Sequence, residues 1–375
     1  MRFIATADWQ LGMAAGFLVD EGARLLFQRA RFDAIARIGQ LARERDAAFI
    51  VVGGDVFESN QLDRGILLRT FEVLRSIDVP VVLLPGNHDP LDAASIYDSP
   101  DFAKRVPDNV VVLRDSNPVE VVRGVEVVGA PWFSKRPTSD LVADALGALE
   151  PAPDGVTRIL VGHGDAMVGI SGDGESVLTI DTTAVQAALD DGRIAFAVVG
   201  DRHSTTEVAP RIWYPGTPEV TRRTETDPGN ALVVDSDSGE VDVVHVGEWK
   251  FVLPEAELGS REDVDAFLAE LGAIEAKERT VVRYILRGGL GMADRAYLED
   301  ELETLVPLFA SLEPWKRHMD LVTVPEDGDF GNLGLSAFAE SAVEELMGLA
   351  RSDSEGARTA QDALTLLYRF VGGVR

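Results

Sequence analysis

Short apolar runs alternate with amphipathic stretches through the first half of the chain. The runs predict buried strands, at 2–7, 49–52, 81–84, 158–161 and 194–199. Between them, apolar residues recur at helical spacing and predict helices, at 21–45, 64–77, 139–149 and 182–189. Because strands that alternate with helices form a sheet with helices on its faces, the pattern predicts an α/β fold.

Other short strands are expected without helices between them, at 110–113, 119–122, 125–128, 231–234 and 241–246. The pattern changes after residue 251 to a helix, a strand, a helix and a strand, at 261–271, 280–286, 292–305 and 319–324. Two amphipathic helices complete the chain, at 335–350 and 357–371.

Two segments rich in glycine and polar residues separate these elements. Residues 169–176 predict a mobile loop, and residues 326–332 predict a linker. We therefore expect three parts: residues 1–250, a small α+β unit at 251–330, and terminal helices at 331–375.

Polar residues follow the predicted strands at the point where each strand ends. They form five segments: Asp8, Gly54-Asp55, Gly86-Asn87-His88-Asp89, Gly162-His163 and Gly200-Asp201-Arg202-His203. Three of the chain's five histidines lie in them. Any one segment could be a polar turn that bonds its own backbone. Five in order favour a shared site, because the loops at one edge of an open α/β sheet carry its chemistry.

These residue types suit two divalent ions with one bridging carboxylate. Asp55 is the expected bridge, and the other expected ligands are Asp8 and His203 for one ion and Asn87, His163 and Asp201 for the second. Water between such ions becomes acidic enough to act as a nucleophile. We expect His88 to stabilise the phosphorus centre or protonate the leaving oxygen, and Asp89 to orient His88.

Composition limits the function further. The chain has 375 residues, no cysteine and a formal net charge of −28. A metal must therefore be held by oxygen and nitrogen ligands. The negative charge argues against a broad nucleic-acid-binding face, although bound cations can receive a phosphodiester locally. We find no apolar run of membrane-spanning length and no signal-peptide pattern, and we expect a cytoplasmic protein without a membrane span.

The ordered series resembles the five motifs of the calcineurin-like metallophosphoesterases. Three longer segments resemble the SbcD branch, bacterial relatives of the meiotic-recombination repair nuclease: 7–12, 53–57 and 214–219. In sequence they read Ala7-Asp8-Trp9-Gln10-Leu11-Gly12, Gly53-Gly54-Asp55-Val56-Phe57 and Tyr214-Pro215-Gly216-Thr217-Pro218-Glu219. The resemblance implies a four-layer α-β-β-α sandwich with a small α+β cap domain and C-terminal helices.

The same resemblance implies an activity and partners. It implies a manganese-dependent enzyme that degrades DNA double-strand ends and cuts single strands. It implies an SbcC-type coiled-coil ATPase as partner, which either of the helices at 335–350 and 357–371 could dock, unless both only pack on the cap. It also implies a homodimer formed near residues 60–100.

Two positions depart from the family pattern. Gln10 stands where the family has a histidine, and Asp201 replaces the first histidine of its Gly-His-x-His motif. Gln10 could be a weak metal ligand, or could only bond a metal water or the phosphate. Both exchanges add oxygen ligands, which favours manganese or magnesium over zinc.

Six cationic residues near these loops are candidate DNA contacts, or simply solvated surface charges: Arg64, Lys135, Arg136, Arg202, Arg222 and Arg223. Two other functions remain open. One is a phosphatase or phosphodiesterase for a small molecule with the same chemistry. The other is a weakened subunit that only clamps DNA, suggested by the changes at Gln10 and Asp201.

Overall fold

The computed structural model describes residues 1–166, 179–324, 337–352 and 356–372. The predicted loop at 169–176 and the predicted linker at 326–332 lie outside the described residues. The chain divides into two compact units. The first comprises Met1–Phe17 and Arg24–Trp249, and the second comprises Leu18–Ala23 and Lys250–Arg375.

The first unit contains two six-stranded sheets. The first sheet has the strand order β12-β11-β1-β2-β3-β4, in which β1 to β4 run parallel. Its strands are β1 (Arg2–Thr6), β2 (Ile50–Val52), β3 (Val81–Leu83), β4 (Val110–Val112), β11 (Asn230–Asp235) and β12 (Val241–His245). The inner strands consist mainly of buried β-branched and aromatic residues, which pack well on a pleated surface.

The second sheet has the order β5-β6-β7-β8-β10-β9, with parallel pairing from β6 to β10. Its strands are β5 (Val119–Val122), β6 (Val125–Gly129), β7 (Thr157–His163), β8 (Phe196–Gly200), β9 (Thr206–Ala209) and β10 (Ile212–Tyr214). Parallel pairing places the carboxyl ends of β7 and β8 at the same edge, so the residues that follow them lie together.

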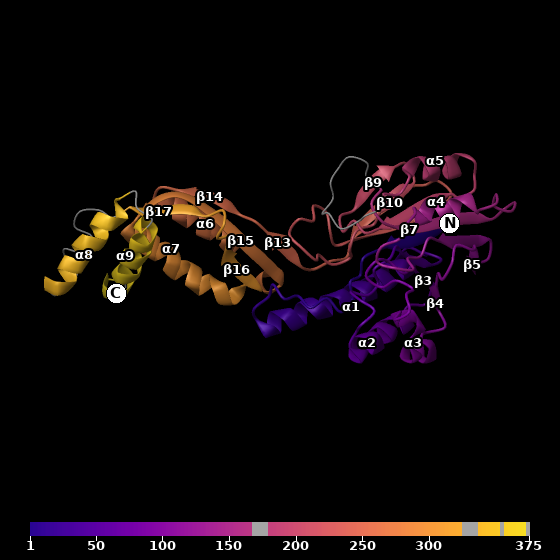
Figure 1. Cartoon of the computed structure of the whole chain (residues 1–375), viewed down its shortest axis with the longest axis horizontal. Helices are drawn as coiled ribbons and strands as arrows, with labels where there is room; N and C mark the ends of the chain where they lie inside the picture. Colours follow the sequence, from indigo (N-terminus) through magenta and orange to yellow (C-terminus); the bar gives the residue numbers. More distant parts are fainter. Residues whose placement is uncertain (167–178, 325–336, 353–355, 373–375) are drawn as a thin grey trace. The chain divides into compact units, whose positions relative to one another are not determined.

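Helices cover the outer face of each sheet (Figure 1). The first sheet carries α1 (Glu21–Glu44), α2 (Arg64–Arg75), the one-turn η1 (Ile96–Asp98) and α3 (Pro100–Arg105). The second carries α4 (Leu141–Gly147) and α5 (Thr182–Asp190). Side chains of Asp63, Asp140 and Asp181 cap α2, α4 and α5 by accepting from free backbone N–H groups.

Alternate strand residues face opposite layers, and this produces separate cores. Ile4 and Ile50 pack beneath α1 and α2, whereas Phe3 and Phe49 join Ile159 of the second sheet in a core between the sheets. The order of layers is therefore helix, sheet, sheet, helix. The predicted four-layer α-β-β-α sandwich is confirmed.

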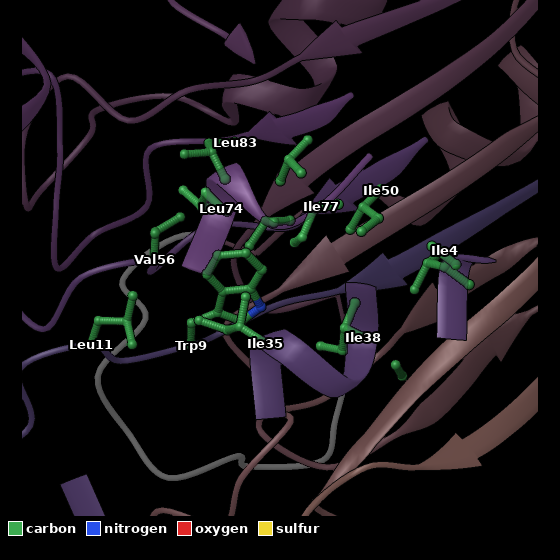
Figure 2. Packing of buried hydrophobic residues seen from close by; sticks show 14 of the residues in the cluster. Ile4, Trp9, Leu11, Ile35, Ile38, Ile50, Val56, Leu74, Ile77 and Leu83 are labelled. Carbon is green, nitrogen blue, oxygen red and sulfur yellow. The ribbon is translucent and has the colours of Figure 1, made fainter. Parts of the chain in front are cut away.

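Trp9 anchors the first motif to the core. Its ring is buried beside Ile35 of α1 (Figure 2), and its Nε1 donates to Oγ1 of Thr6 at 3.1 Å. The flanking residues Asp8 and Gln10 are thereby fixed on either side of a residue that cannot move without opening the core.

The second unit is built on one long strand, β15 (Thr280–Gly291), to which four shorter strands pair in parallel. They are β13 (Lys250–Val252), β14 (Glu255–Leu258), β16 (Ser311–Pro314) and β17 (Asp320–Val324). Its helices are α6 (Arg261–Ala273), η2 (Lys277–Arg279), α7 (Met292–Leu305), η3 (Val306–Leu308), α8 (Ala337–Ala350) and α9 (Ala357–Gly372). None of the described helices has both the length and the apolar character that crossing a bilayer requires.

Candidate metal centre

The carboxyl ends of β2 and β8 touch, although these strands belong to different sheets. A Cβ atom on Gly200 would lie 1.8 Å from the carbonyl oxygen of Gly53, so only glycine fits there. A Cβ atom on Gly54 would lie 2.2 Å from Nδ1 of His163. The motif-bearing ends of the two sheets therefore meet at one place.

Four of the motif residues have a left-handed backbone. The φ angles are 52° for Asp8, 49° for Gln10, 50° for Asp55 and 93° for Asp201. Such a conformation costs a non-glycine residue about 1–2 kcal/mol. Asp8 N donates to Gly54 O and Gln10 N donates to Asp55 O, each at 3.0 Å, so the surrounding structure imposes the strain. Strain held in this way is typical of functional sites.

The side chain of His163 is the centre of one group of ligands. Its Nε2 lies 2.7 Å from Oδ1 of Asn87. The same nitrogen lies 3.5 Å from Oδ1 of Asp55 and 3.7 Å from Oδ1 of Asp201. Nδ1 lies 2.8 Å from the carbonyl oxygen of Gly53, which can only accept. A proton is therefore held on Nδ1, and Nε2 is the nitrogen that can bind a metal when it loses its proton.

This group fits a divalent cation. Oδ1 of Asn87 faces only acceptors, and hydrogen bonds to Asp55 and His163 would form only if the amide were reversed. With the oxygen inward, an imidazole nitrogen, an amide oxygen and carboxylate oxygens present lone pairs to each other. A hard cation satisfies all of them, and the donor set suits manganese or magnesium.

Asp8 and His203 form a second group beside the first. Asp201 N donates to both carboxylate oxygens of Asp8, at 3.1 and 3.2 Å. Nε2 of His203 lies 4.0 Å from Oδ1 of Asp8. On the other side of the ring, Nδ1 lies 2.8 Å from Oγ1 of Thr221 and 2.9 Å from Oε1 of Glu225. Nε2 of His203 is therefore the ring nitrogen that is directed at the carboxylate of Asp8.

Asp55 lies between the two groups. Asp8, Asp55 and His163 each offer a ligand atom, and these atoms all lie within 4.8 Å of one another. Oδ1 of Asp55 faces His163, whereas Oδ2 accepts a hydrogen bond from Nε2 of Gln10 at 3.1 Å. A carboxylate with its two oxygens directed to two sides can bridge a pair of ions.

The negative charge of the centre changes the pKa values of its members. Burial, helped by the carboxylates of Asp55 and Asp201, raises the pKa of Asp8 to about 7. Burial lowers the pKa of His163, but Asp55, Asp8 and Asp201 outweigh it and raise this pKa to about 9. Burial also raises the pKa of Asp201. Bound cations would offset this charge and lower all of these values.

His88 lies at the edge of the centre. Its ring is 32% exposed, and its Nε2 lies 3.8 Å from Oδ2 of Asp55. Nδ1 lies 3.0 Å from the carbonyl oxygen of Glu58 and 3.9 Å from the carboxylate of the same residue. His88 thus presents Nε2 to the metal side and solvent, which suits a group that contacts the substrate.

Asp89 has a different role from the one predicted. Its carboxylate accepts from Gly86 N at 2.7 Å, from Phe57 N at 3.0 Å and from the Tyr97 hydroxyl at 2.7 Å. Burial, and next the charge of Asp55, raise the pKa of Asp89 to about 6. The prediction that Asp89 orients His88 is wrong, because the buried carboxylate accepts instead from two backbone N–H groups and the Tyr97 hydroxyl.

The side chains of the predicted DNA contacts differ in whether they already bind other residues of the chain. Arg64 donates to both carboxylate oxygens of Asp101, at 3.0 and 3.2 Å. Nε of Arg202 donates to a threonine hydroxyl on β9 at 3.0 Å. Arg222 and Arg223 are exposed on the segment that follows β10.

Lys135 and Arg136 lie on an exposed segment that follows Trp132. Neither forms an ion pair with a residue of the described ranges. The segment is fixed by Trp132, whose Nε1 donates to the carbonyl oxygen of His163 at 2.9 Å. The next residue, Phe133, is 53% exposed. An exposed aromatic ring and two exposed cations therefore follow Trp132, which contacts His163, closely in the sequence.

Three residues of the site escaped the sequence analysis: Glu58, Trp132 and Glu225. Glu58 directly follows the Gly53–Phe57 segment, and Trp132 comes shortly after the strand at 125–129. Both positions could therefore have been identified in the sequence as neighbours of the site. Glu225 carried none, because it reaches His203 across 22 residues of chain.

The sequence profile of the calcineurin-like phosphoesterases matches residues 1–204. The chain belongs to this family. Its members are hydrolases that act on phosphoric esters with divalent metals, and the centre described above is the part of the fold that supplies the ligands. Comparison with curated proteins finds no significant match.

Several solved structures are similar to this calcineurin-like phosphoesterase. A dimetal phosphatase from Danio rerio is 13% identical, with 57% of this chain and 86% of that chain covered and a TM-score of 0.37. The Pseudomonas putida nuclease MPE is 17% identical, with 45% and 66% covered and a TM-score of 0.24. A purple acid phosphatase from yellow lupin (Lupinus luteus) seeds is 14% identical, with 64% and 52% covered and a TM-score of 0.36.

Proposed function

We propose that this calcineurin-like phosphoesterase is a metal-dependent DNA phosphodiesterase of the SbcD branch. The observation that carries the reaction type is the inward-facing set of lone pairs on Asn87, His163 and Asp55, joined by Asp8. Two bound ions, for which we propose manganese, would activate water and neutralise a phosphodiester.

The chain's own residues would complete the reaction. Gly53 O and Glu225 hold a ring proton on Nδ1 of His163 and of His203, so that Nε2 of each ring is the nitrogen available to a metal. His88, held by Glu58, is the residue at the rim that can donate a proton to the leaving oxygen or stabilise the phosphoryl group. Asp8, Gln10, Asp55, Asn87, His163, Asp201 and His203 constitute the proposed ligand set.

DNA as the substrate is supported by the exposed segment that follows Trp132. Phe133 can stack on an unpaired base, and Lys135 and Arg136 can contact phosphates. The three SbcD-like segments support the same substrate. We extend the proposal to an SbcC-type ATPase partner docked on α8 and α9, and to a homodimer near residues 60–100.

A small phosphoester is the second candidate substrate. The net charge of −28 would repel a long polyanion, and Arg64 is already paired with Asp101. A small substrate would need only the ions and His88, so its cleavage would not depend on Lys135 and Arg136.

Cleavage assays with the full chain separate these candidates. We would incubate it with manganese, magnesium or EDTA and a labelled duplex, a hairpin, a chromogenic phosphodiester or a chromogenic phosphomonoester. Metal-dependent cleavage of duplex and hairpin that is lost in His88→Ala is the expected result. Turnover of chromogenic substrates alone would favour the second candidate, and no turnover would favour a clamp without catalysis.

A further inference from the structure

Glu225 contacts His203 in the way that a carboxylate orients a metal-binding imidazole. Oε1 of Glu225 lies 2.9 Å from Nδ1 of His203, and the Glu225 side chain is only 4% exposed. A buried carboxylate is an acceptor only, so it holds the ring proton on Nδ1. We propose that Glu225 is a positioning residue that fixes the tautomer and ring direction of His203, so that Nε2 can bind a divalent ion beside Asp8.

The carboxylate is itself held in place by Thr221. Thr221 N donates to Oε2 of Glu225 at 2.9 Å, and the Thr221 hydroxyl donates to Oε1. The same hydroxyl oxygen lies 2.8 Å from Nδ1 of His203. Two side chains thus contact Nδ1 of His203, and the opposite nitrogen is directed at Asp8. Outer partners of this kind are worth about 10- to 100-fold in metal affinity.

The two histidines of the centre differ in a way that makes the inference testable. His163 is oriented by the carbonyl oxygen of Gly53, which no substitution can remove. His203 is oriented by a side chain, which can be exchanged. In Glu225→Gln the amide can donate to Nδ1, so the ring proton moves to Nε2 and blocks the metal-binding nitrogen.

The inference rests on the proposed metal centre but not on DNA as the substrate. The test measures manganese binding to the full chain by titration calorimetry, for the wild type, Glu225→Gln and Thr221→Val. We expect Glu225→Gln to lose about 10- to 100-fold in affinity at one of two sites, and Thr221→Val to lose less. Glu207→Gln, at an exposed glutamate on β9, is the matched control and should bind as the wild type does.

Nitrogen NMR of the metal-free chain gives a second readout that general destabilisation would not produce. At alkaline pH, where the His203 ring is neutral, it should carry its proton on Nδ1 in the wild type and change tautomer in Glu225→Gln. An unchanged tautomer together with unchanged manganese affinity would overturn the proposal, as would a wild type that binds no manganese.

Should Glu225→Gln fail to fold, Thr221→Val decides, because it removes one partner of Nδ1 at constant shape. A wild type that binds two ions but leaves DNA intact would defeat the proposed substrate alone.

Discussion

Nε2 of Gln10 donates a hydrogen bond to Oδ2 of Asp55 at 3.1 Å, within a pair of loops whose backbones are also joined. The amide therefore satisfies the oxygen of Asp55 that faces away from His163. Gln10 replaces a basic imidazole with a neutral donor at this point. Metal binding on this side would then depend mainly on Asp8 and His203.

Exchange of the Gln10 amide for a carboxylate should make the stability of the protein depend on bound metal. In Gln10→Glu two buried carboxylates face each other, and we expect a loss of about 2–3 kcal/mol in the free energy of unfolding in EDTA. Manganese should restore much of the loss. Thermal melts with and without manganese measure both, with Gln61→Glu at an exposed position as the control. Equal stability of Gln10→Glu and wild type in EDTA would contradict the structure of this site.

The stabilisation by metal should increase with pH. Folding raises the pKa of Asp8 from 3.8 to about 7 and that of His163 from 6.5 to about 9, so the folded metal-free chain binds protons more tightly than the unfolded chain. Its stability therefore falls as pH rises through these ranges. Metal binding needs both groups deprotonated, so affinity rises over the same range.

Melting temperatures in manganese and in EDTA check this prediction. We expect their difference to be small at about pH 6 and to grow steadily to about pH 9. A difference that shrinks as pH rises would mean that protons and metal do not compete at Asp8 and His163.

His88 should matter for turnover and not for metal binding. Its Nε2 is 3.8 Å from Asp55 and its ring is partly exposed, so His88→Ala removes a substrate contact without opening the ligand set. We expect kcat to fall about 10²- to 10⁴-fold while manganese affinity stays within about twofold. His318→Ala, at an exposed histidine of the second unit, is the control. A parallel loss of manganese affinity would instead make His88 a ligand.

Gly200 should be among the least replaceable residues. In Gly200→Ala the new methyl group would meet the Gly53 carbonyl, which belongs to backbone and cannot turn away. We expect a loss of about 2–3 kcal/mol in stability and loss of metal binding, because the strand ends must separate. Urea unfolding and calorimetry measure the two effects. Gly192→Ala, where a Cβ meets nothing within 4 Å, is the control, although its φ of 76° adds a small cost of its own.

The sequence predicted the elements of the sandwich well because their apolar periodicity is strong. It ended one strand too early, at residue 286, whereas β15 continues to Gly291. Glycines at 288, 289 and 291 argue against a strand locally. Pairing of this half of β15 with β14 and β17 overrides that local preference.

The site was predictable where a motif residue follows a strand, since the strand determines where the side chain lies. Roles that depend on which of several groups forms a hydrogen bond were not predictable from the sequence. No residue next to Asp89 in the sequence identifies its hydrogen-bond donors, yet three donors converge on its carboxylate in the fold. Glu225 is brought to His203 by a loop whose path has no periodic signal.

The contact between Gly53 and Gly200 joins two sheets that share no strand pairing. Asp8, Asp55 and Asn87 come from loops of one sheet, and His163, Asp201 and His203 from loops of the other. Neither sheet alone can supply the whole set of proposed metal ligands. Bound ions would therefore hold the motif-bearing loops of the two sheets together. The two fragments of a chain cut between β4 and β5, which also pair through β1 and β11, should associate more tightly when manganese is present.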